Sequence, residues 1–581
     1  MPETAKPLLE VQDLSIDFDT RDGCLQAVRG MSWHVNAGET VAIVGESGSG
    51  KSVSTSAVMG LLDMPPARIR SGRILYEGED LLHISPARRR EINGRRIGMI
   101  FQDPLAGLNP VYPVGWQVAE TLRAHGVSAR QADADALALL RRMGLQRAAE
   151  RFNNHPHRFS GGQRQRIMIA MAIAMRPNLL IADEPTTALD VTVQAAILDL
   201  LKELQRETGM AMLLITHDLA VVARVADRVV VVNGGQVIET GTTAELLASP
   251  KHPYTQKLIG SLPLPGRYAH CGAADAKAPS LLAVEKLSKL YDAGGNGMFA
   301  KRRPPARALD EVSFELRRGE TLGVIGESGS GKSTLARTLM KLEPADGGSI
   351  RIQGIETTTL REKQFNRYRR DIQMVFQDPS ASLDPRMTVG DIIAEPWTVH
   401  RDVVPRDKRA ARVAELLEQV DLSPEDARRA PHEFSGGQRQ RIAIARALAL
   451  QPKILICDEA VSALDASVRA QVIGLLKRLK DELGLAYLFI AHNLNVVADF
   501  AHRILVMQHG RVVEQGLTAA VFRNPHHPYT RALLAAEPVF PHFQQGSCGE
   551  GPVCANDEPP VIPFRKSTGS ASPHVHEGAT Q

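Results

Sequence analysis

The stretch GESGSGKS occurs twice in the chain, at Gly45–Ser52 and at Gly326–Ser333. Both copies fit the pattern G-x-x-x-x-G-K-[ST] of a loop that cradles phosphate groups. Glycines let the backbone N–H groups of such a loop turn toward phosphate oxygens, where side chains would obstruct them. A Gly/Ser-rich stretch can also be a flexible linker, but each copy follows a short apolar run, TVAIV (Thr40–Val44) or TLGVI (Thr321–Ile325), and precedes a predicted helix. The repeat therefore predicts two nucleotide sites.

Each phosphate loop contains a lysine, which supplies a positive charge, and a serine, which can ligate a metal ion. Lys51 and Lys332 are placed to reach the β- and γ-phosphates, and the hydroxyls of Ser52 and Ser333 can ligate Mg²⁺. Mg²⁺ is therefore an expected cofactor, held together with the phosphates of a nucleotide. The predicted phosphate-binding residues are Gly45, Glu46, Ser47, Gly48, Ser49, Gly50, Lys51 and Ser52, and Gly326, Glu327, Ser328, Gly329, Ser330, Gly331, Lys332 and Ser333.

The repeat extends far beyond the phosphate loops. Five later residues recur at a constant separation of 275 positions, as shown by the pairs Gln102 and Gln377, Ser160 and Ser435, Asp183 and Asp458, His217 and His492, and Tyr254 and Tyr529. Internal repetition of this kind indicates one domain written twice. A length of 581 residues also exceeds what a single core supports.

The domain organisation follows from the repeat and from composition. We predict a nucleotide-binding domain over residues 1–264, a linker over 265–280, a second domain over 281–540 and a disordered tail over 541–581. Apolar strands alternate with helical crossovers in each domain. Residues 115–150 and 390–430 have helical apolar spacing and predict a helical insertion. The expected fold class is α/β, with two tandem phosphate-loop domains.

Composition limits the possible partners. The net charge of +4 is too balanced to indicate nucleic-acid binding. Five scattered cysteines show no disulfide framework, which favours a reducing cytoplasmic setting. The apolar run Ile167–Met175 is well short of the roughly 20 residues of a membrane span. We therefore expect a soluble chain that reaches a membrane only through a partner.

Two apolar runs end in a pair of carboxylates, Asp183-Glu184 and Asp458-Glu459. Downstream of a phosphate loop, the first carboxylate of each pair is expected to hold Mg²⁺ through its waters. The second, Glu184 or Glu459, is a candidate to polarise the attacking water.

The stretch FSGGQRQR precedes an apolar helix at Phe159–Arg166 and at Phe434–Arg441. Serine and two glycines at a helix start offer backbone donors to an anion. The alternative is that the serine only caps the helix. The candidate nucleotide contacts are Ser160, Gly161, Gly162 and Gln163, and Ser435, Gly436, Gly437 and Gln438.

Across almost the whole chain, these motifs resemble those of the nucleotide-binding subunits of ABC transporters. The family's LSGGQ stands here as FSGGQ, its glutamine loop as FQDP, and the loop that pairs the two halves as TALD and SALD. The resemblance implies metal contact by Gln102 and Gln377 and γ-phosphate contact by His217 and His492. It also implies two ATP sites, one joining Gly45–Ser52 to Ser435–Gln438 and the other joining Gly326–Ser333 to Ser160–Gln163.

Two positions depart from the family pattern. Asn493 replaces the usual Asp beside the histidine, and Ala460 replaces the equivalent of Pro185. Neither change removes a group that contacts nucleotide, so both sites are expected to hydrolyse ATP. The resemblance also implies an aromatic residue stacked on adenine. Tyr291 fits this role in the second copy, and Phe18 is the candidate in the first, where it could equally be a core strand residue.

The segments SPKHPYTQKLI and NPHHPYTRALL close the two copies and resemble the oligopeptide, dipeptide and nickel importer branch of the family. Proline and tyrosine favour a fixed turn that packs an aromatic ring, so we assign this motif no catalytic role. No iron–sulfur site is expected, because Cys271, Cys548 and Cys554 are too few for a cluster-binding segment.

The resemblance implies an ATPase coupled to transmembrane import, peripheral on the cytoplasmic face of the inner membrane. Two membrane permeases and a periplasmic substrate-binding protein are the expected partners. Glutathione or short peptides are the expected cargo, with dipeptides, longer peptides and nickel as alternatives. A soluble twin-domain protein that acts on ribosomes or DNA is a more distant alternative, because such proteins carry a long charged linker or zinc-binding cysteine pairs.

Overall fold

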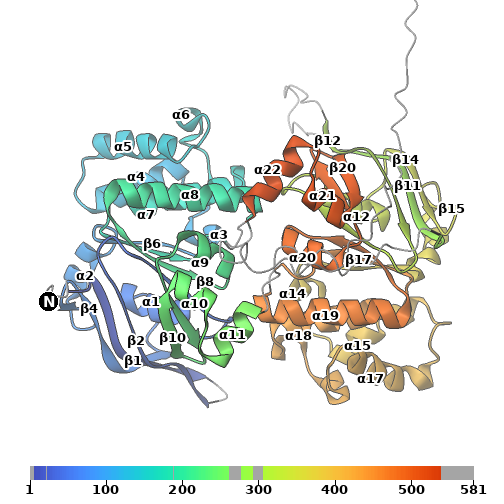
Figure 1. The fold of residues 1–581 in the computed structure, drawn as a ribbon, viewed down its shortest axis with the longest axis horizontal. Coiled ribbons are helices and arrows are strands. Elements are labelled where there is room, and N and C mark those ends of the chain that lie inside the picture. The colour runs from blue at the N-terminus through green and yellow to red at the C-terminus, as the bar shows by residue number, and fades with distance from the viewer. Residues whose placement is uncertain are drawn as a thin grey trace, which may run out of the picture.

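A computed structural model of the chain describes residues 6–20, 23–186, 189–260, 277–291, 305–462 and 464–537. The two copies of the repeat lie side by side, the first coloured blue to green and the second yellow to red in Figure 1. Most of the predicted linker 265–280 and all of the tail 541–581 fall outside the described residues, as do Cys271, Cys548 and Cys554. The three boundaries between these predicted segments therefore stay predictions.

The core of the first half is a six-stranded sheet in the order β10-β9-β3-β8-β7-β6. Its strands are parallel except β10, which runs antiparallel to β9. Every residue of β3, β7 and β8 is buried, as expected for apolar strands covered on both faces. The strands are β3 (Thr40–Val44), β6 (Ile97–Ile100), β7 (Leu179–Asp183), β8 (Ala211–Thr216), β9 (Arg228–Asn233) and β10 (Gln236–Thr242).

A second, antiparallel sheet in the first half has the order β2-β1-β4-β5. Its strands are β1 (Leu9–Thr20), β2 (Gly23–Val35), β4 (Ala67–Tyr76) and β5 (Glu79–Asp80).

The helices of the first half include those of the insertion predicted over residues 115–150, which are α4, α5 and α6. They are α1 (Lys51–Met59), α2 (Pro86–Ile92), α3 (Pro104–Gly107), α4 (Val114–Ala124), α5 (Ala129–Arg142), α6 (Ala148–Arg151), η1 (Pro156–Arg158), α7 (Gly161–Ile173), α8 (Val191–Thr208), α9 (Leu219–Val225), α10 (Thr243–Ala248) and α11 (Pro253–Gly260).

The second half repeats both sheets, in the orders β12-β11-β14-β15 and β16-β17-β18-β13-β19-β20. The strands are β11 (Ser280–Tyr291), β12 (Ala306–Arg317), β13 (Thr321–Ile325), β14 (Gly347–Ile352), β15 (Ile355–Glu356), β16 (Ile372–Val375), β17 (Ile454–Asp458), β18 (Ala486–Ile490), β19 (Arg503–Gln508) and β20 (Arg511–Leu517).

The helices of the second half largely repeat those of the first and include several additional short ones. They are α12 (Lys332–Leu339), α13 (Glu362–Phe365), η2 (Tyr368–Arg370), α14 (Pro379–Ser382), α15 (Val389–Ala394), α16 (Pro396–Val399), η3 (Arg406–Lys408), α17 (Arg409–Gln419), η4 (Pro424–Arg428), η5 (Pro431–Glu433), α18 (Gly436–Leu448), α19 (Ala466–Leu483), α20 (Leu494–Phe500), α21 (Thr518–Arg523) and α22 (Pro528–Ala536).

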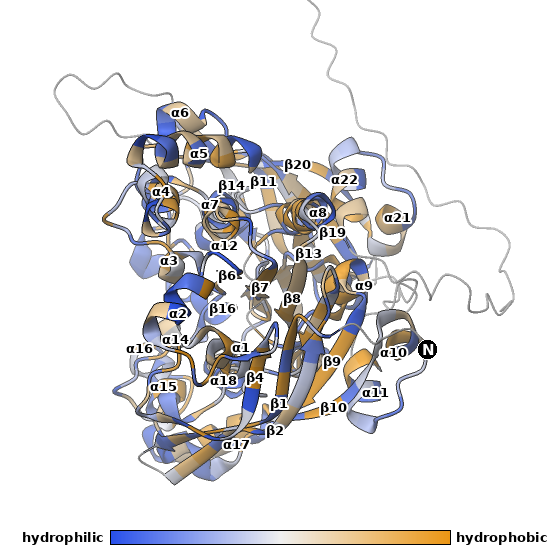
Figure 2. Ribbon diagram, turned by 90° about the vertical axis from the view of Figure 1, so that its left-hand side faces the viewer, coloured by the Kyte–Doolittle hydropathy of each residue, from blue (hydrophilic) through white to orange (hydrophobic). Residues whose placement is uncertain are grey.

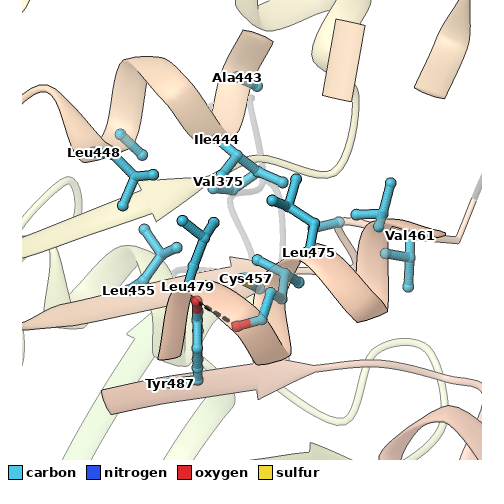
Figure 3. Close-up of a cluster of buried hydrophobic side chains, with 14 of the residues drawn as sticks. Val375, Ala443, Ile444, Leu448, Leu455, Cys457, Val461, Leu475, Leu479 and Tyr487 are labelled. Carbon is cyan, nitrogen blue, oxygen red and sulfur yellow. Dashed lines mark hydrogen bonds between the residues drawn. The ribbon is translucent and has the colours of Figure 1, made fainter. Parts of the chain in front are cut away.

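Hydrophobic residues concentrate on the central strands, as the orange colour of β8 and β9 in Figure 2 shows. In the second half, β17, β18, α18 and α19 enclose one such cluster, which includes Cys457 and Leu479 (Figure 3). Tyr487 belongs to the same cluster and donates a hydrogen bond of 3.1 Å from its hydroxyl to the carbonyl of Leu476. These cores pack helices against the central sheets.

The predicted α/β class with two phosphate-loop domains is confirmed. In the first half, the phosphate loop follows β3, the carboxylate pair ends β7, and His217 follows β8. Because parallel neighbours place their carboxyl ends at one edge, these groups meet there. Helix α22 of the second half lies against α8 of the first (Figure 1). Within the described residues, no helix has both the length and the apolar character that a membrane crossing requires.

Candidate functional site

Both phosphate loops depend on glycine for their shape. Gly50 and Gly331 have φ angles of 91° and 104°, in the left-handed region. A Cβ atom on Gly50 would lie 2.4 Å from the carbonyl oxygen of Ala27, and one on Gly331 would lie 2.3 Å from that of Ala308. Conformation and space therefore both require glycine just before α1 and α12.

The loop lysines are buried and point back into their own loops. The Nζ atom of Lys51 donates to the carbonyls of Gly45 (2.8 Å) and Glu46 (2.7 Å) and to the hydroxyl of Ser49 (3.2 Å). Lys332 makes the two equivalent carbonyl bonds, at 2.6 and 2.8 Å. Burial lowers the pKa of both ammonium groups, although nearby carboxylates oppose that shift. A buried ammonium group in a glycine loop is suited to bind an anion.

A hydroxyl and a carboxylate meet beside each lysine. Ser52 Oγ lies 3.2 Å from Asp183 Oδ1, and Ser333 Oγ lies 3.1 Å from Asp458 Oδ1. Burial raises the pKa of Asp183 to about 6 and also raises that of Asp458, while the serine hydroxyl opposes the shift in each case. A cation would compensate this desolvated carboxylate, and hard oxygen ligands are those that Mg²⁺ prefers.

The described residues contain no group of three or more His, Cys, Asp or Glu side chains that could hold a metal ion by themselves. A divalent cation at these two positions would therefore rely on one serine, one carboxylate, water and the phosphates of a ligand. This is the sparse protein ligation typical of Mg²⁺ in nucleotide sites.

Glu184 is held from two sides in the first half. Gln102 donates from Nε2 to Glu184 Oε2 at 2.9 Å, and His217 Nδ1 lies 2.9 Å from Oε1. Glu184 has a φ of 45° and directly follows β7. The arrangement fixes a carboxylate at the mouth of the phosphate loop, between an amide and an imidazole.

The second half repeats this arrangement with one looser contact. Gln377 donates to Glu459 Oε2 at 2.7 Å, and His492 Nδ1 lies 3.8 Å from the same oxygen. The imidazole of His492 lowers the pKa of Glu459, against the raising effect of burial. The carboxylate is therefore favoured in its charged form, which a group that accepts a proton from water requires.

The SGGQ segments cap the helices that they begin. Ser160 Oγ accepts from the N–H of Gln163 at 3.4 Å, and Gln163 Oε1 accepts from the N–H of Ser160 at 3.3 Å. Ser435 and Gln438 form the same reciprocal cap. Capping uses the serine side chain, while the backbone N–H groups at the helix start are the donors expected to face an anion.

The two halves meet at their phosphate loops. Asp190 Oδ1 accepts a hydrogen bond of 2.6 Å from the N–H of Ser328, and Thr192 donates to Glu327 Oε1 at 2.6 Å. Reciprocally, Ser467 donates to Glu46 Oε1 at 2.6 Å. The starts of α8 and α19 therefore contact the phosphate loop of the opposite half.

The SGGQ segments lie beside the same helix starts. A Cβ atom on Gly162 would lie 2.5 Å from Val193 in α8, and one on Gly437 would lie 2.2 Å from Val468 in α19. In the described part of the chain, no hydrogen bond joins an SGGQ residue to the opposite phosphate loop. The structure thus brings each SGGQ segment to the inter-half boundary through the adjacent helix.

The two adenine-stacking candidates occupy equivalent positions. Phe18 lies opposite Leu25 in the strand pairing, and Tyr291 lies opposite Ala306. Leu25 and Ala306 each stand two residues before the alanine, Ala27 or Ala308, whose carbonyl faces the phosphate-loop glycine. Tyr291 is 39% exposed, whereas Phe18 is partly buried against the core of the first half. Their equivalent register supports Phe18 as the counterpart of Tyr291.

Two features of the site escaped the sequence-based reasoning. The hydroxyls of Tyr254 and Tyr529 accept hydrogen bonds from the N–H groups of Glu46 (3.2 Å) and Glu327 (2.9 Å) in the phosphate loops. The signal was available, because these tyrosines keep the same 275-residue separation as the other site residues. The Pro-Tyr motif itself predicts only a turn that packs a ring.

The other feature explains Asn493. Its Oδ1 accepts from the N–H of Val496 at 3.1 Å and caps α20, as Asp218 Oδ1 caps α9 by accepting from Ala220 at 2.9 Å. Asparagine and aspartate are equally good caps, so the departure preserves the local structure after the histidine.

Comparisons with known proteins agree with these motifs. Residues 28–187 and 309–462 match the ABC transporter family, and residues 238–308 and 513–549 match the oligopeptide/dipeptide transporter C-terminal region. The glutathione import ATP-binding protein GsiA of Salmonella typhimurium is 46% identical over 563 residues, covering 92% of this chain and 90% of that protein. The protein of the same name from Escherichia coli K12 is 46% identical over 560 residues, with the same coverage.

A solved dimeric ATP-binding cassette bound to ADP and Pi is 31% identical over 41% of this chain and 98% of its own length, with a TM-score of 0.37.

Proposed function

The chain belongs to the family of ABC transporter ATP-binding proteins, and we propose that it powers the import of glutathione or short peptides by hydrolysing ATP. The family resemblance recognised in the motifs is confirmed by the matches over both halves. The observation that carries the proposal is the pair of fixed carboxylates, Glu184 and Glu459. Each lies beside a buried phosphate-loop lysine that also interacts with an aspartate of the opposite half.

The proposed reaction is attack of water on the γ-phosphate of ATP. Glu184 and Glu459 accept the proton of that water, while Gln102 and Gln377 hold these carboxylates in place. Lys51 and Lys332 neutralise charge on the phosphates once they exchange their contacts within the loop. His217 and His492 are proposed to contact the γ-phosphate from the other side.

Each ATP is proposed to lie between the two halves. One site joins Gly45–Ser52 to Ser435–Gln438, and the other joins Gly326–Ser333 to Ser160–Gln163. Support comes from the hydrogen bonds that tie each phosphate loop to the opposite α8 or α19. Tyr291 and Phe18 are proposed to stack on adenine, consistent with their equivalent register.

Mg²⁺ is the proposed metal cofactor, and when bound it would neutralise charge on the β- and γ-phosphates. Ser52 with Asp183, and Ser333 with Asp458, would hold it, with Gln102 and Gln377 nearby. The fit rests on the hydroxyl and the desolvated carboxylate that meet at each position.

Two membrane permeases and a periplasmic substrate-binding protein are the proposed partners, with the chain peripheral on the cytoplasmic face of the inner membrane and not bound to nucleic acid. Similarity to glutathione import proteins along 92% of the chain supports glutathione as cargo. Dipeptides, longer peptides and nickel are the alternatives. A soluble protein acting on ribosomes or DNA is disfavoured by the matched transporter C-terminal region.

The test is ATPase activity of the chain reconstituted with its co-purifying permeases. The substrate-binding protein is added loaded with glutathione, a dipeptide or nickel in turn. We expect stimulation by the glutathione-loaded form. Stimulation by another cargo alone would refute the glutathione assignment, and hydrolysis that no permease or cargo changes would refute the importer assignment.

A further inference from the structure

The His-Pro-Tyr segments at the end of each half reach the nucleotide sites directly. Tyr254, in the first turn of α11, accepts the N–H of Glu46 through its hydroxyl at 3.2 Å. Tyr529, in the first turn of α22, accepts the N–H of Glu327 at 2.9 Å. The glutamate is the second residue of the phosphate loop in both cases, so the contact is reproduced independently in the two halves.

The tyrosine of the first half is held in place by hydrogen bonds from backbone N–H groups to the side chains of Glu239 and His252. Glu239 in β10 accepts the N–H groups of Lys251 (2.8 Å) and His252 (3.0 Å) with its two carboxylate oxygens. His252 Nδ1 then accepts the N–H of Tyr254 at 3.1 Å. The chain entering α11 is therefore fixed to the central sheet, which gives the phenol a defined position.

The second half contains the same network. Glu514 in β20 accepts the N–H groups of His526 (2.8 Å) and His527 (3.1 Å), and His527 Nδ1 accepts the N–H of Tyr529 at 3.2 Å. In each half, one carboxylate, one histidine and one tyrosine thus serve the same purpose, which is to present a hydroxyl to the phosphate loop.

Glu46 is the residue at which three structural elements meet. Its N–H donates to Tyr254, its carbonyl accepts from Lys51 at 2.7 Å, and its carboxylate accepts from Ser467 of the opposite half at 2.6 Å. In the second half, Glu327 bonds in the same three ways to its tyrosine, its lysine and Thr192 of the first half. The position of this one residue therefore affects both the lysine and the inter-half contact.

The lysine must change its contacts when a phosphate arrives. An ammonium group has three donors, and Lys51 directs all three to atoms of its own loop. At least one of these bonds has to be exchanged for a phosphate oxygen. The Glu46 peptide can keep its orientation during that exchange if its N–H remains bonded to the tyrosine.

We propose that Tyr254 and Tyr529 are positioning residues that hold the phosphate loops in a nucleotide-ready shape and direct Glu46 and Glu327 toward the opposite half. In this way, each C-terminal extension couples ATP binding to the contact between the halves. The inference rests on the proposed function, because it assigns a role within the ATP cycle.

A purely structural role makes a different prediction. Both rings also pack against the hydrophobic clusters of their own halves. Phenylalanine would preserve this packing and remove only the hydroxyl. Tyr254→Phe and Tyr529→Phe therefore separate the two roles without deleting the ring. Tyr487→Phe is the matched control, because its hydroxyl donates to the carbonyl of Leu476 inside the core.

The experiment measures ATP affinity, kcat, KM and thermal stability of the full chain and of these variants. Loss of one neutral hydrogen bond predicts an affinity for ATP about 2- to 10-fold weaker per altered site. We expect KM to rise by that factor in Tyr254→Phe and Tyr529→Phe, with a thermal stability no lower than that of Tyr487→Phe. Unchanged affinity and KM in both tyrosine variants would overturn the proposal.

A double-mutant cycle tests the coupling to the opposite half. Tyr254→Phe and Ser467→Ala remove hydroxyls that bind the same glutamate from different halves. We expect their effects on ATP affinity to be non-additive, and additive effects would overturn the coupling. If the wild-type chain hydrolyses no ATP, the proposed function fails, whereas the affinity measurements still decide the role of the tyrosines.

Discussion

The carboxylate of Asp190 in the first half accepts a 2.6 Å hydrogen bond from the backbone N–H of Ser328 in the second half. The equivalent residue, Asp465, instead accepts from the N–H of Val468 at 2.9 Å and caps its own helix. Asp190 makes no such cap to α8. The same aspartate thus has different contacts in the two copies of the motif. Asp190 joins the halves, whereas Asp465 stabilises α19.

This difference predicts unequal effects of the same substitution. Asp190→Ala should weaken ATP binding at the loop that contains Ser328, because that loop loses its contact with the first half. Asp465→Ala should lower the free energy of unfolding by about 0.5–2 kcal/mol, the usual cost of a lost helix cap. ATP titration and thermal unfolding of the two variants provide the comparison. Equal effects of both variants on both quantities would refute the asymmetry.

The SGGQ segments contain a matched pair of glycines. A Cβ atom on Gly162 would lie 2.5 Å from Val193, whereas one on Gly161 would lie 3.6 Å from Leu189. Valine is stiff about χ1 and cannot easily move aside. We expect Gly162→Ala to lower the free energy of unfolding by about 1–3 kcal/mol and Gly161→Ala to leave it nearly unchanged. Chemical denaturation measures both, and a larger loss for Gly161→Ala would contradict the packing.

Glu537 lies at the boundary between the halves, and the burial of its carboxyl group predicts that the stability of the chain depends on pH. Asn495 donates to Glu537 Oε1 at 2.6 Å, and the buried Oε2 has no hydrogen-bond partner among the described residues. Burial raises the pKa of Glu537 to about 8. The charge of Asp218 in the first half adds to that shift, and Arg469 opposes it.

A carboxyl pKa that is raised on folding favours the folded state at low pH and loses that contribution as pH rises toward 8. The wild-type chain should therefore lose stability between about pH 4.5 and 8 relative to Glu537→Gln, by at most about 1.4 kcal/mol per pH unit. Thermal unfolding of both proteins across this range is the measurement. Parallel curves would show that Glu537 titrates as it does in the unfolded chain.

Much of the site could be predicted from the sequence because its motifs are local and occur twice. The phosphate loops, the carboxylate pairs, the glutamines and the histidines each follow a strand of the same sheet. Because β3, β8 and β7 are neighbours in the sheet, the residues at or beyond their carboxyl ends lie close together. These residues are Lys51, Asp183, Glu184 and His217. The apolar runs that identify β3 and β7 are continuous, as expected for strands buried on both faces.

Contacts between distant segments could not be predicted in this way. The bond from Glu46 to Tyr254 joins residues 208 positions apart, and that from Glu46 to Ser467 joins residues 421 positions apart. Neither side chain carries a motif that specifies its partner. The different uses of Asp190 and Asp465 are also invisible in TALD and SALD, because both are the same aspartate at the start of a helix.

Glu184 and Glu459 are proposed to accept the proton of the attacking water in the two ATP sites. The most direct measurement compares ATP binding and ATP turnover of the wild-type chain and of the Glu184→Gln plus Glu459→Gln double variant. Glutamine keeps the size of the side chain and removes its ability to accept a proton. We predict unchanged ATP binding and a turnover at least about 100-fold slower. Turnover at the wild-type rate would contradict the account.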